Sequence, residues 1–170
     1  MGMKFRMGEQ QNGRAAVLET LASGIEKEAG FNSVVVNLFR PDEDDYEILV
    51  LRGPDALRNA IGGEKLTRDS WMQLLEGRFE RLGAFFIPEG EGEWGDSPMY
   101  DPPEDAGEGE NRWRKGDALF APMRCSHGSI LGIVSVDEPR NGQRPTSRQI
   151  LTLTSLCAQA GTALDADGEH

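Results

Sequence analysis

The chain has 170 residues, enough for one domain with its own hydrophobic core, and 29 acidic against 18 basic side chains give it a net charge of −11. This negative charge repels phosphate backbones and anionic lipids, so we expect neither a nucleic acid nor a membrane as a partner. The two cysteines are too few for a disulfide framework and fit a reducing compartment. The sequence has no apolar run of membrane-spanning length and no signal-peptide pattern at its N-terminus, so we expect a cytoplasmic protein.

The N-terminal part of the chain predicts a short tail and a helix. Residues 1–10 are expected to form a flexible tail that precedes the folded domain. Residues 11–29 predict a helix, because Val17, Leu21 and Ile25 recur every four residues and form one apolar stripe. This stripe indicates that one side of the helix packs against another element.

Two strands and two helical segments are predicted next. The β-branched run 33–39 and the run 46–52 flank the turn PDEDD, a pattern that indicates a hairpin. Residues 54–82 predict a short helix over DALRNAIG and a longer one over TRDSWMQLLEGRFERL, with Thr67 or Asp69 as its N-cap.

A long acidic loop is predicted in the middle of the chain, over residues 89–115, after a short apolar strand at 84–88. Its first part, residues 89–110, holds nine acids, five glycines, three prolines and no base, a composition that excludes a regular element. A loop of this length within a domain is either a functional lid or mobile chain. Trp94 and Tyr100 are unusual in a disordered segment, so part of the loop is expected to fold over another region.

The last part of the chain predicts a second hairpin and a C-terminal helix. Residues 117–125 and 129–137 are apolar strands separated only by the three residues SHG, which fit a hairpin turn. Residues 145–167 predict the clearest helix, with Thr146 and Gln149 in the positions of a capping box. Asp137 closes the preceding strand, and its carboxylate is expected to accept hydrogen bonds from backbone amides of the following turn.

The order of these elements predicts an α/β fold of the α+β class. Strands joined by tight turns favour an antiparallel sheet, and the amphipathic first and last helices are expected to cover one of its faces. The whole is expected to form a single domain over residues 11–167.

This pattern resembles the GAF domains of bacterial signalling proteins. The most specific stretch is GDALFAPMRCSHGSILGIVSVDEPRNGQRPT, residues 116–146, which is similar to the late hairpin and capped helix of such domains. AFFIP at 84–88 and WRKGD at 113–117 are similar to the same family, and the resemblance covers residues 11–165.

The resemblance implies a cytoplasmic sensory or regulatory module that is not an enzyme. It implies a central antiparallel sheet with the N- and C-terminal helices on one face and a pocket, enclosed by loops and helices, on the other. Such modules dimerise through their terminal helices, here 11–29 and 145–167. They act beside an output domain such as a kinase, a cyclase or a transcription regulator.

The implied pocket is expected between the sheet and residues 61–115, and aromatic side chains are its candidate lining. Apolar walls with few polar groups suit a small ligand, although no motif identifies that ligand or any cofactor. Ordinary core packing is the alternative role for each of these side chains. The candidates are Trp71, Phe86, Trp94, Tyr100, Trp113 and Phe120.

Cys125 and His127 lie two positions apart in the predicted turn SHG and its flank, where they could form a nucleophile with its base or half of a metal site. We expect a structural role instead, because the third group that orients such a pair, and further metal ligands, are missing nearby. No catalytic residue and no metal site is therefore predicted. Cys157, on the small-residue face of the last helix, is expected to be packed in the core or in an interface.

Two alternatives to a ligand-binding sensor remain open at this stage. A thiol-dependent enzyme of this fold, similar to free-methionine-sulfoxide reductases, would use Cys125. A ligand-free scaffold would have a filled core and act through protein contacts alone. Residues 54–115 contain neither cysteine nor histidine, which argues against the attachment of a bilin or a haem in the pocket region.

Overall fold

The computed structural model describes residues 2–95, 97, 100 and 108–167, and an antiparallel sheet lies at its centre. Among the described residues this sheet has seven strands in the order β3-β2-β1-β7-β6-β5-β4, with every neighbouring pair antiparallel. The strands are β1 (Phe31–Arg40), β2 (Asp45–Arg52), β3 (Lys65–Thr67), β4 (Glu80–Arg81), β5 (Ala84–Ile87), β6 (Ala118–Arg124) and β7 (Ile130–Pro139). The predicted α+β class with an antiparallel sheet is confirmed.

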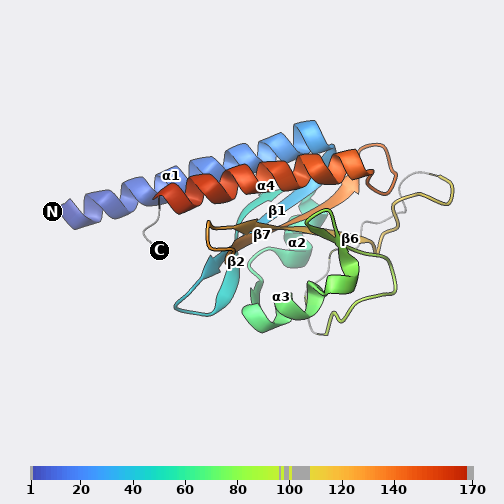
Figure 1. The fold of residues 1–170 in the computed structure, drawn as a ribbon, viewed down its shortest axis with the longest axis horizontal. Coiled ribbons are helices and arrows are strands. Elements are labelled where there is room, and N and C mark those ends of the chain that lie inside the picture. Colours follow the sequence, from blue (N-terminus) through green and yellow to red (C-terminus); the bar gives the residue numbers. More distant parts are fainter. Residues whose placement is uncertain (1, 96, 98–99, 101–107, 168–170) are drawn as a thin grey trace.

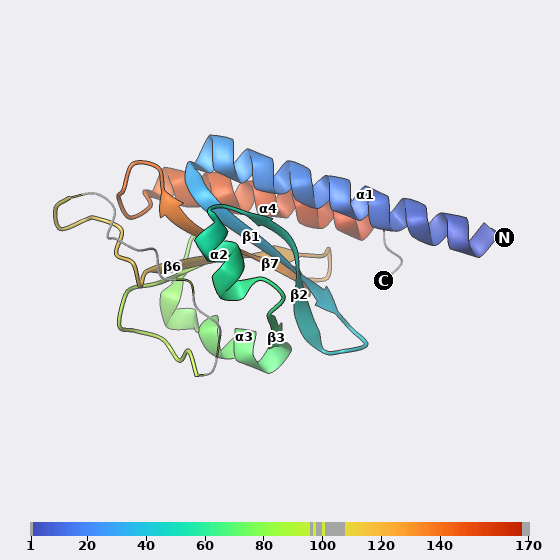
Figure 2. The ribbon, with the colours of Figure 1, turned by 180° about the vertical axis from the view of Figure 1, so that it is seen from behind.

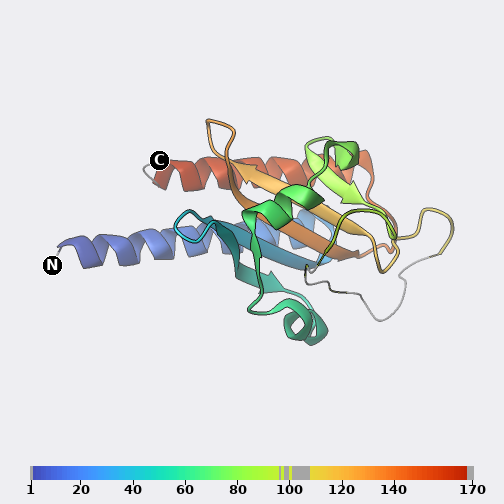
Figure 3. The same ribbon diagram turned by 90° about the horizontal axis from the view of Figure 1, so that it is seen from below.

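Helices lie on both faces of the sheet and give the molecule three layers (Figures 1 and 2). The long helices α1 (Gly2–Gly24) and α4 (Ser147–Asp167) run side by side in opposite directions along one face. The shorter α2 (Asp55–Ile61), α3 (Arg68–Leu74) and the 3₁₀ turn η2 (Gly77–Phe79) lie on the other side, as the view from below shows (Figure 3). None of the helices within the described residues combines the length and the apolar content of a membrane span.

The first helix is longer than the sequence predicts. It begins at Gly2, so residues 2–10, which were expected in the tail, are helical. Most of them are good helix formers, and Gly8 costs only about 1 kcal/mol relative to alanine, which does not end a helix. After the π-helical turn η1 (Ile25–Ala29), Gly30 ends the helix with a φ of 80°, a left-handed conformation that glycine adopts without steric cost.

The predicted helix over residues 67–82 is wrong in its second half. α3 ends at Leu74, and the chain continues through η2 into β4, which pairs with β5. Gly77 disfavours a continued helix. Leu82 and Gly83 have φ values of 54° and 89° and form the tight turn that folds β4 back onto β5.

The larger of two core clusters fills the space between the sheet and the long helices. Val34 and Val36 of β1 point into it and are fully buried, as is Cys157 of α4, so the predicted core position of this cysteine is confirmed. Gly161 lets α4 approach the end of β6 closely, because an added Cβ would lie 2.5 Å from the carbonyl oxygen of Arg124. The face of the sheet that these helices cover is therefore tightly packed.

Candidate functional site

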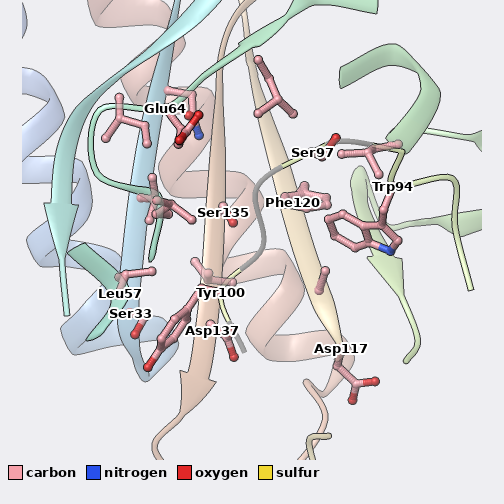
Figure 4. A pocket seen from close by; sticks show the side chains of 18 of the residues that line it. Ser33, Leu57, Glu64, Trp94, Ser97, Tyr100, Asp117, Phe120, Ser135 and Asp137 are labelled. Carbon is pink, nitrogen blue, oxygen red and sulfur yellow. The ribbon is translucent and has the colours of Figure 1, made fainter. Parts of the chain in front are cut away.

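A cavity lies on the face of the sheet opposite α1 and α4 (Figure 4). Its volume is about 90 Å³. Its walls come from β1, β6 and β7, from α2 and α3, and from the acidic segment that follows β5. Figure 4 shows Trp94 beside Phe120 at one wall and Tyr100 near Ser33 at the other. We refer to this space as the α3 cavity.

Strand alternation places the polar side chains of β1 in the α3 cavity. Ser33, Val35 and Asn37 line it, whereas the intervening valines point into the helix-covered core. Asn37 is buried, and its Nδ2 donates to the carbonyl oxygen of Ile133 at 3.1 Å. The amide of Asn37 is thus already paired within the sheet.

Aromatic side chains from three parts of the chain form the apolar wall of the cavity. Trp71 of α3 meets Phe120 of β6 edge to face, with 5.1 Å between the ring centroids, and Trp94 meets Phe120 at 6.0 Å. Such pairs add about 0.5–1.5 kcal/mol beyond their buried area. Thr67 caps α3 as predicted, because its hydroxyl accepts a hydrogen bond from the backbone nitrogen of Ser70 at 3.1 Å.

Trp71 brings an unpaired hydrogen-bond donor to this wall. The residue is only 5% exposed, and its Nε1 has no hydrogen-bond partner among the described residues. Trp94 differs, because its Nε1 donates to the carbonyl oxygen of Glu91 at 3.1 Å. A buried donor without a partner costs about 1–3 kcal/mol. The nitrogen is itself buried within the wall, so an acceptor on a ligand reaches it only if the wall shifts.

Tyr100 ties the acidic segment to the sheet at the edge of the cavity. Its hydroxyl donates to Oε1 of Glu138 at 3.0 Å, and the hydroxyl of Ser33 donates to Oε2 of the same carboxylate at 2.5 Å. Burial, followed by the hydrogen bond to Glu138, raises the pKa of Tyr100 to about 12. Glu138 has a φ of 54°, a strained conformation for a residue other than glycine, and these two bonds help to hold it.

Asp137 and Asp117 are carboxylates of the cavity wall that the protein itself pairs. Asp137 accepts from the backbone nitrogen of Glu138 at 2.7 Å, as predicted for the turn, and also from Nε1 of Trp113 at 2.7 Å. Asp117 has a fully buried side chain and accepts from Nε and Nη2 of Arg144 at 2.8 and 2.9 Å. The backbone nitrogen of Glu89 also donates to Asp117, at 2.9 Å, so this carboxylate joins the two ends of the acidic segment.

The structure places two of the six predicted pocket aromatics outside the α3 cavity, and this corrects their assignment. Trp113 packs against Phe31 at 6.3 Å and against Phe86 at 6.0 Å, in the helix-covered core. In β5 it is the neighbouring Phe85 that belongs to the cluster on the cavity side, and strand alternation turns Phe86 to the opposite face. The predicted aromatics that do line the cavity are Trp71, Trp94, Tyr100 and Phe120.

Cys125 and His127 lie in the turn between β6 and β7, where the sequence predicts them. The backbone nitrogen of Cys125 donates to the carbonyl oxygen of Ser129, and that of Gly128 donates to the carbonyl oxygen of Cys125, both at 2.9 Å. Gly128 supplies the positive φ of the turn, 86°. In the part of the chain that the structure describes, no three histidine, cysteine or acidic side chains are grouped as metal ligands would be.

Several residues of the cavity wall were not predicted from the sequence. Ser33 and Asn37 carry a signal, because they interrupt an apolar run at positions of the same parity and so mark one face of β1. Asp117 in the wall and Glu138 beside it carry no such signal, since their partners Arg144 and Tyr100 come from distant parts of the chain.

The chain matches solved structures, but no protein-family model and no curated protein matches it. The GAF domain/HD domain protein from Geobacter sulfurreducens matches with a TM-score of 0.64 and 13% identity, over 91% of this chain and 93% of that one. Residues 122 to 287 of a methyl-accepting chemotaxis protein match with a TM-score of 0.62 and 15% identity, over 91% and 90% of the two chains. The second GAF domain of DevS from Mycobacterium smegmatis matches with a TM-score of 0.54 and 16% identity, over 90% and 94%.

These similarities define the architecture as an α+β domain with two terminal helices on one face of an antiparallel sheet. The chain has the GAF fold. The resemblance predicted from residues 116–146 is therefore confirmed at the level of the fold.

Proposed function

We propose that this chain is a GAF-type sensory module of a signalling protein, and not an enzyme, which binds a small molecule in the α3 cavity. The observation that carries this proposal is the α3 cavity itself, whose wall includes Trp71 with its buried, unpaired Nε1. Evolution of a ligand-free core tends to remove such donors, because each one costs free energy. A bound molecule with a hydrogen-bond acceptor would satisfy it if the wall shifts.

The volume of the α3 cavity, about 90 Å³, limits the kind of ligand. A single water needs about 10–15 Å³ of such space, and pockets for drug-sized ligands have about 300–1,000 Å³. The cavity in this conformation therefore fits a molecule of few heavy atoms, rather than a bilin, a haem or a cyclic nucleotide. Leu57, Ile61 and Leu74 contribute apolar wall, so the ligand combines a small apolar body with a carbonyl-type acceptor.

Native mass spectrometry of the purified protein, compared with its denatured mass, tests this proposal. We expect a non-covalent adduct whose affinity falls about tenfold or more in Trp71→Phe, because phenylalanine keeps the apolar ring and removes the donor. Trp94→Phe is the matched control, since its indole nitrogen already has a partner in Glu91. Equal binding by both variants would remove Trp71 from the site. No adduct, and no thermal shift across a panel of small metabolites, would favour the scaffold alternative.

The thiol enzyme is the weaker alternative. Cys125 does not line the α3 cavity, and Cys157 is fully buried, which raises its pKa to about 12. A thiol at such a pKa is not a nucleophile at neutral pH. Ligand binding that is unchanged in Cys125→Ser would support the sensory reading, and its loss would support the enzyme.

We also propose a homodimer through the outer surface of the two long helices. Leu151 of α4 is 50% exposed, and the shallow groove between α1 and α4 is lined mainly by small and apolar side chains, among them Ala16, Val17 and Ala163. Such a surface suits a second pair of helices. Sedimentation equilibrium should show a dimer that Leu151→Glu dissociates and Leu49→Glu, at another exposed leucine, does not. A monomer at the highest soluble concentration would contradict the dimer.

We propose that the module acts in the cytoplasm beside an output domain such as a kinase, a cyclase or a transcription regulator. The support is the same fold in a GAF domain/HD domain protein and in a methyl-accepting chemotaxis protein. A fusion of α4 to a diguanylate cyclase should show ligand-dependent activity that Trp71→Phe abolishes, and activity that ignores the ligand would contradict this role.

A further inference from the structure

A second and larger cavity, with a volume of about 610 Å³, lies at the other end of the same strands. Whereas the α3 cavity lies along the first half of β1 and the second half of β7, this one lies at the β1–β2 hairpin and the β6–β7 turn. The start of α3 and parts of α1 and α4 complete it. We call it the hairpin groove and define it by Arg14, Tyr46, Arg68, Met72, Arg124 and His127.

The charge of the hairpin groove is opposite to that of the whole chain. Arg14, Arg68, Arg124 and His127 line it, and among the residues whose side chains the structure describes no acidic residue lines it, although the net charge of the chain is −11. Asp44 and Asp165 lie close by without lining the groove: Asp44 acts on the hydroxyl of Tyr46, and Asp165 accepts from the backbone nitrogen of Ser126 at 3.0 Å. An anion that enters the groove therefore meets mainly positive charge.

The arginines of the groove are also unpaired. Within the described residues, the guanidinium groups of Arg14 and Arg68 have no hydrogen-bond or ion-pair partner, and Arg124 uses only Nη1, which donates to the carbonyl oxygen of Gly128 at 2.9 Å. Four arginines elsewhere in the fold pair with carboxylates, whereas others, such as Arg58 and Arg81, donate to backbone carbonyl oxygens. These pairs are Arg40 with Asp45, Arg52 with Glu26, Arg78 with Glu76, and Arg144 with Asp117.

Tyr46 adds a hydroxyl donor that opens to the groove from a largely buried side chain. The residue is 2% exposed and lines the groove, yet its hydroxyl makes no hydrogen bond to any residue that the structure describes. Its ring is held in place by Phe39 at 5.1 Å and by Trp71 at 6.2 Å between centroids. This fixed hydroxyl is open to the groove, where it can donate to water or to an oxygen of a ligand.

The surroundings of the Tyr46 hydroxyl place two of the arginines near it. Burial raises the pKa of Tyr46, and Asp44 raises it further, whereas the positive charges of Arg68 and Arg124 act in the opposite direction. The hydroxyl therefore stays protonated at neutral pH and can donate, with two guanidinium groups within electrostatic range.

We infer that the hairpin groove is a binding site for a small organic anion, namely a phosphate or carboxylate group carried on an apolar body. Guanidinium groups bind the oxygens of either anion in bidentate geometry, and the hydroxyl of Tyr46 adds a third direction of donation. The remaining walls are apolar, with Met72, Ile130 and Leu131 in contact range of an attached body. The volume lies within the range of about 300–1,000 Å³ that is usual for small-molecule sites.

Isothermal titration calorimetry on the full chain with four compounds tests the chemistry of this site. Phenyl phosphate or phenylacetate should bind, and the tighter of the two shows whether the natural anion is a phosphate or a carboxylate. Inorganic phosphate should bind at least about tenfold more weakly, because it lacks the apolar body, and benzyl alcohol should not bind. The inference is overturned if neither organic anion binds at millimolar concentration, or if either control compound binds as tightly as the anions.

Variants then test the location of the site. Arg68 and Arg124 are exposed, so Arg68→Gln and Arg124→Gln leave the core intact and should each weaken binding about tenfold, while Tyr46→Phe should weaken it a few-fold. Arg148→Gln, at an exposed arginine of α4, should change nothing. Unchanged affinity in both groove variants, or equal losses in Arg148→Gln, would show binding elsewhere or general charge attraction and would overturn the inference.

Discussion

The α3 cavity and the hairpin groove lie at opposite ends of β1 and β7, and they differ in how their polar groups are paired. In the α3 cavity the carboxylates of Asp117 and Asp137 accept hydrogen bonds from the protein, and one buried donor, on Trp71, is left over. In the hairpin groove the arginines and the hydroxyl of Tyr46 are largely without protein partners. We therefore propose ligands at the polar groups that the fold leaves unpaired, and we assign the paired carboxylates to the stability of the fold.

The largest loss of stability is expected when the hydrogen bonds and the ion pair of Asp117 are removed. Asp117→Ala removes a buried carboxylate with four hydrogen bonds and leaves Arg144 without its partner, so we expect a loss of about 3 kcal/mol in the free energy of unfolding. Urea denaturation measures it. Asp45→Ala removes the more exposed pair with Arg40 and should lower the stability clearly less than Asp117→Ala does. Equal losses for the two variants would contradict the structural role of Asp117.

The close approach of α4 to the hairpin groove can be tested with two glycines. Gly161→Ala should destabilise the protein by about 2 kcal/mol, because the new methyl group would lie 2.5 Å from the carbonyl oxygen of Arg124. Gly24→Ala should instead stabilise α1 by up to about 1 kcal/mol, since its nearest neighbour, Leu156, would lie at an ordinary 3.6 Å. Thermal unfolding checks both, and the same sign for both variants would show that the contact at Arg124 is not tight.

Tyr100 provides a pH-dependent test of the α3 cavity edge. Its folded pKa of about 12 lies above the usual value of about 10, so its protonated hydroxyl stabilises the fold below pH 10, and this contribution is lost as the pH rises to about 12. Tyr100→Phe should lower the free energy of unfolding by about 1 kcal/mol at pH 8. Because the variant lacks this hydroxyl, its stability should also fall less as the pH rises from 10 to about 12.

Ultraviolet titration gives the pKa of Tyr100 directly, because the chain has only two tyrosines and Tyr46→Phe leaves Tyr100 as the single signal. A titration midpoint near 10 in that variant would show that the hydroxyl does not interact with Glu138.

The smallest change in stability is expected for substitution of one of the two cysteines, whose thiols should also differ in reactivity. With a thiol reagent at pH 8, one cysteine per native chain should react quickly, because burial raises the pKa of Cys157 to about 12 while Cys125 lies in a partly exposed turn. Cys125→Ser should abolish the fast reaction and change the free energy of unfolding by less than about 0.5 kcal/mol. A fast reaction of Cys157 in that variant would mean that α4 opens readily from the sheet.

Local patterns in the sequence predicted most of the fold. The two hairpins follow from β-branched runs with tight turns between them, and α4 follows from its apolar stripe and its cap, where the Thr146 hydroxyl accepts from the backbone nitrogen of Gln149 at 3.2 Å. The helix over 67–82 was wrong after Leu74, because a strongly helical sequence pattern does not reveal that Leu82 and Gly83 form a turn into β5.

The candidate sites were predicted only in part, because they depend on which face each side chain takes and on contacts across the chain. AFFI has no alternation of polar and apolar residues, so the sequence could not show that Phe85 and not Phe86 points toward the cavity side. The hairpin groove was not predicted at all. Arg14, Arg68 and Arg124 come from three separate elements, and only the folded sheet brings them together.

α3 is the element that the two cavities share. Trp71 and Leu74 line the α3 cavity, and Arg68 and Met72 line the hairpin groove. A helix of seven residues is not stable by itself, so α3 keeps its position only through the contacts on these two sides. Two ligands that each shift α3 must then obey thermodynamic reciprocity: the factor by which the first changes the affinity of the second equals the factor by which the second changes the affinity of the first. The binding free energies of the two ligands would then be coupled, so that occupancy of either site would change the affinity of the other.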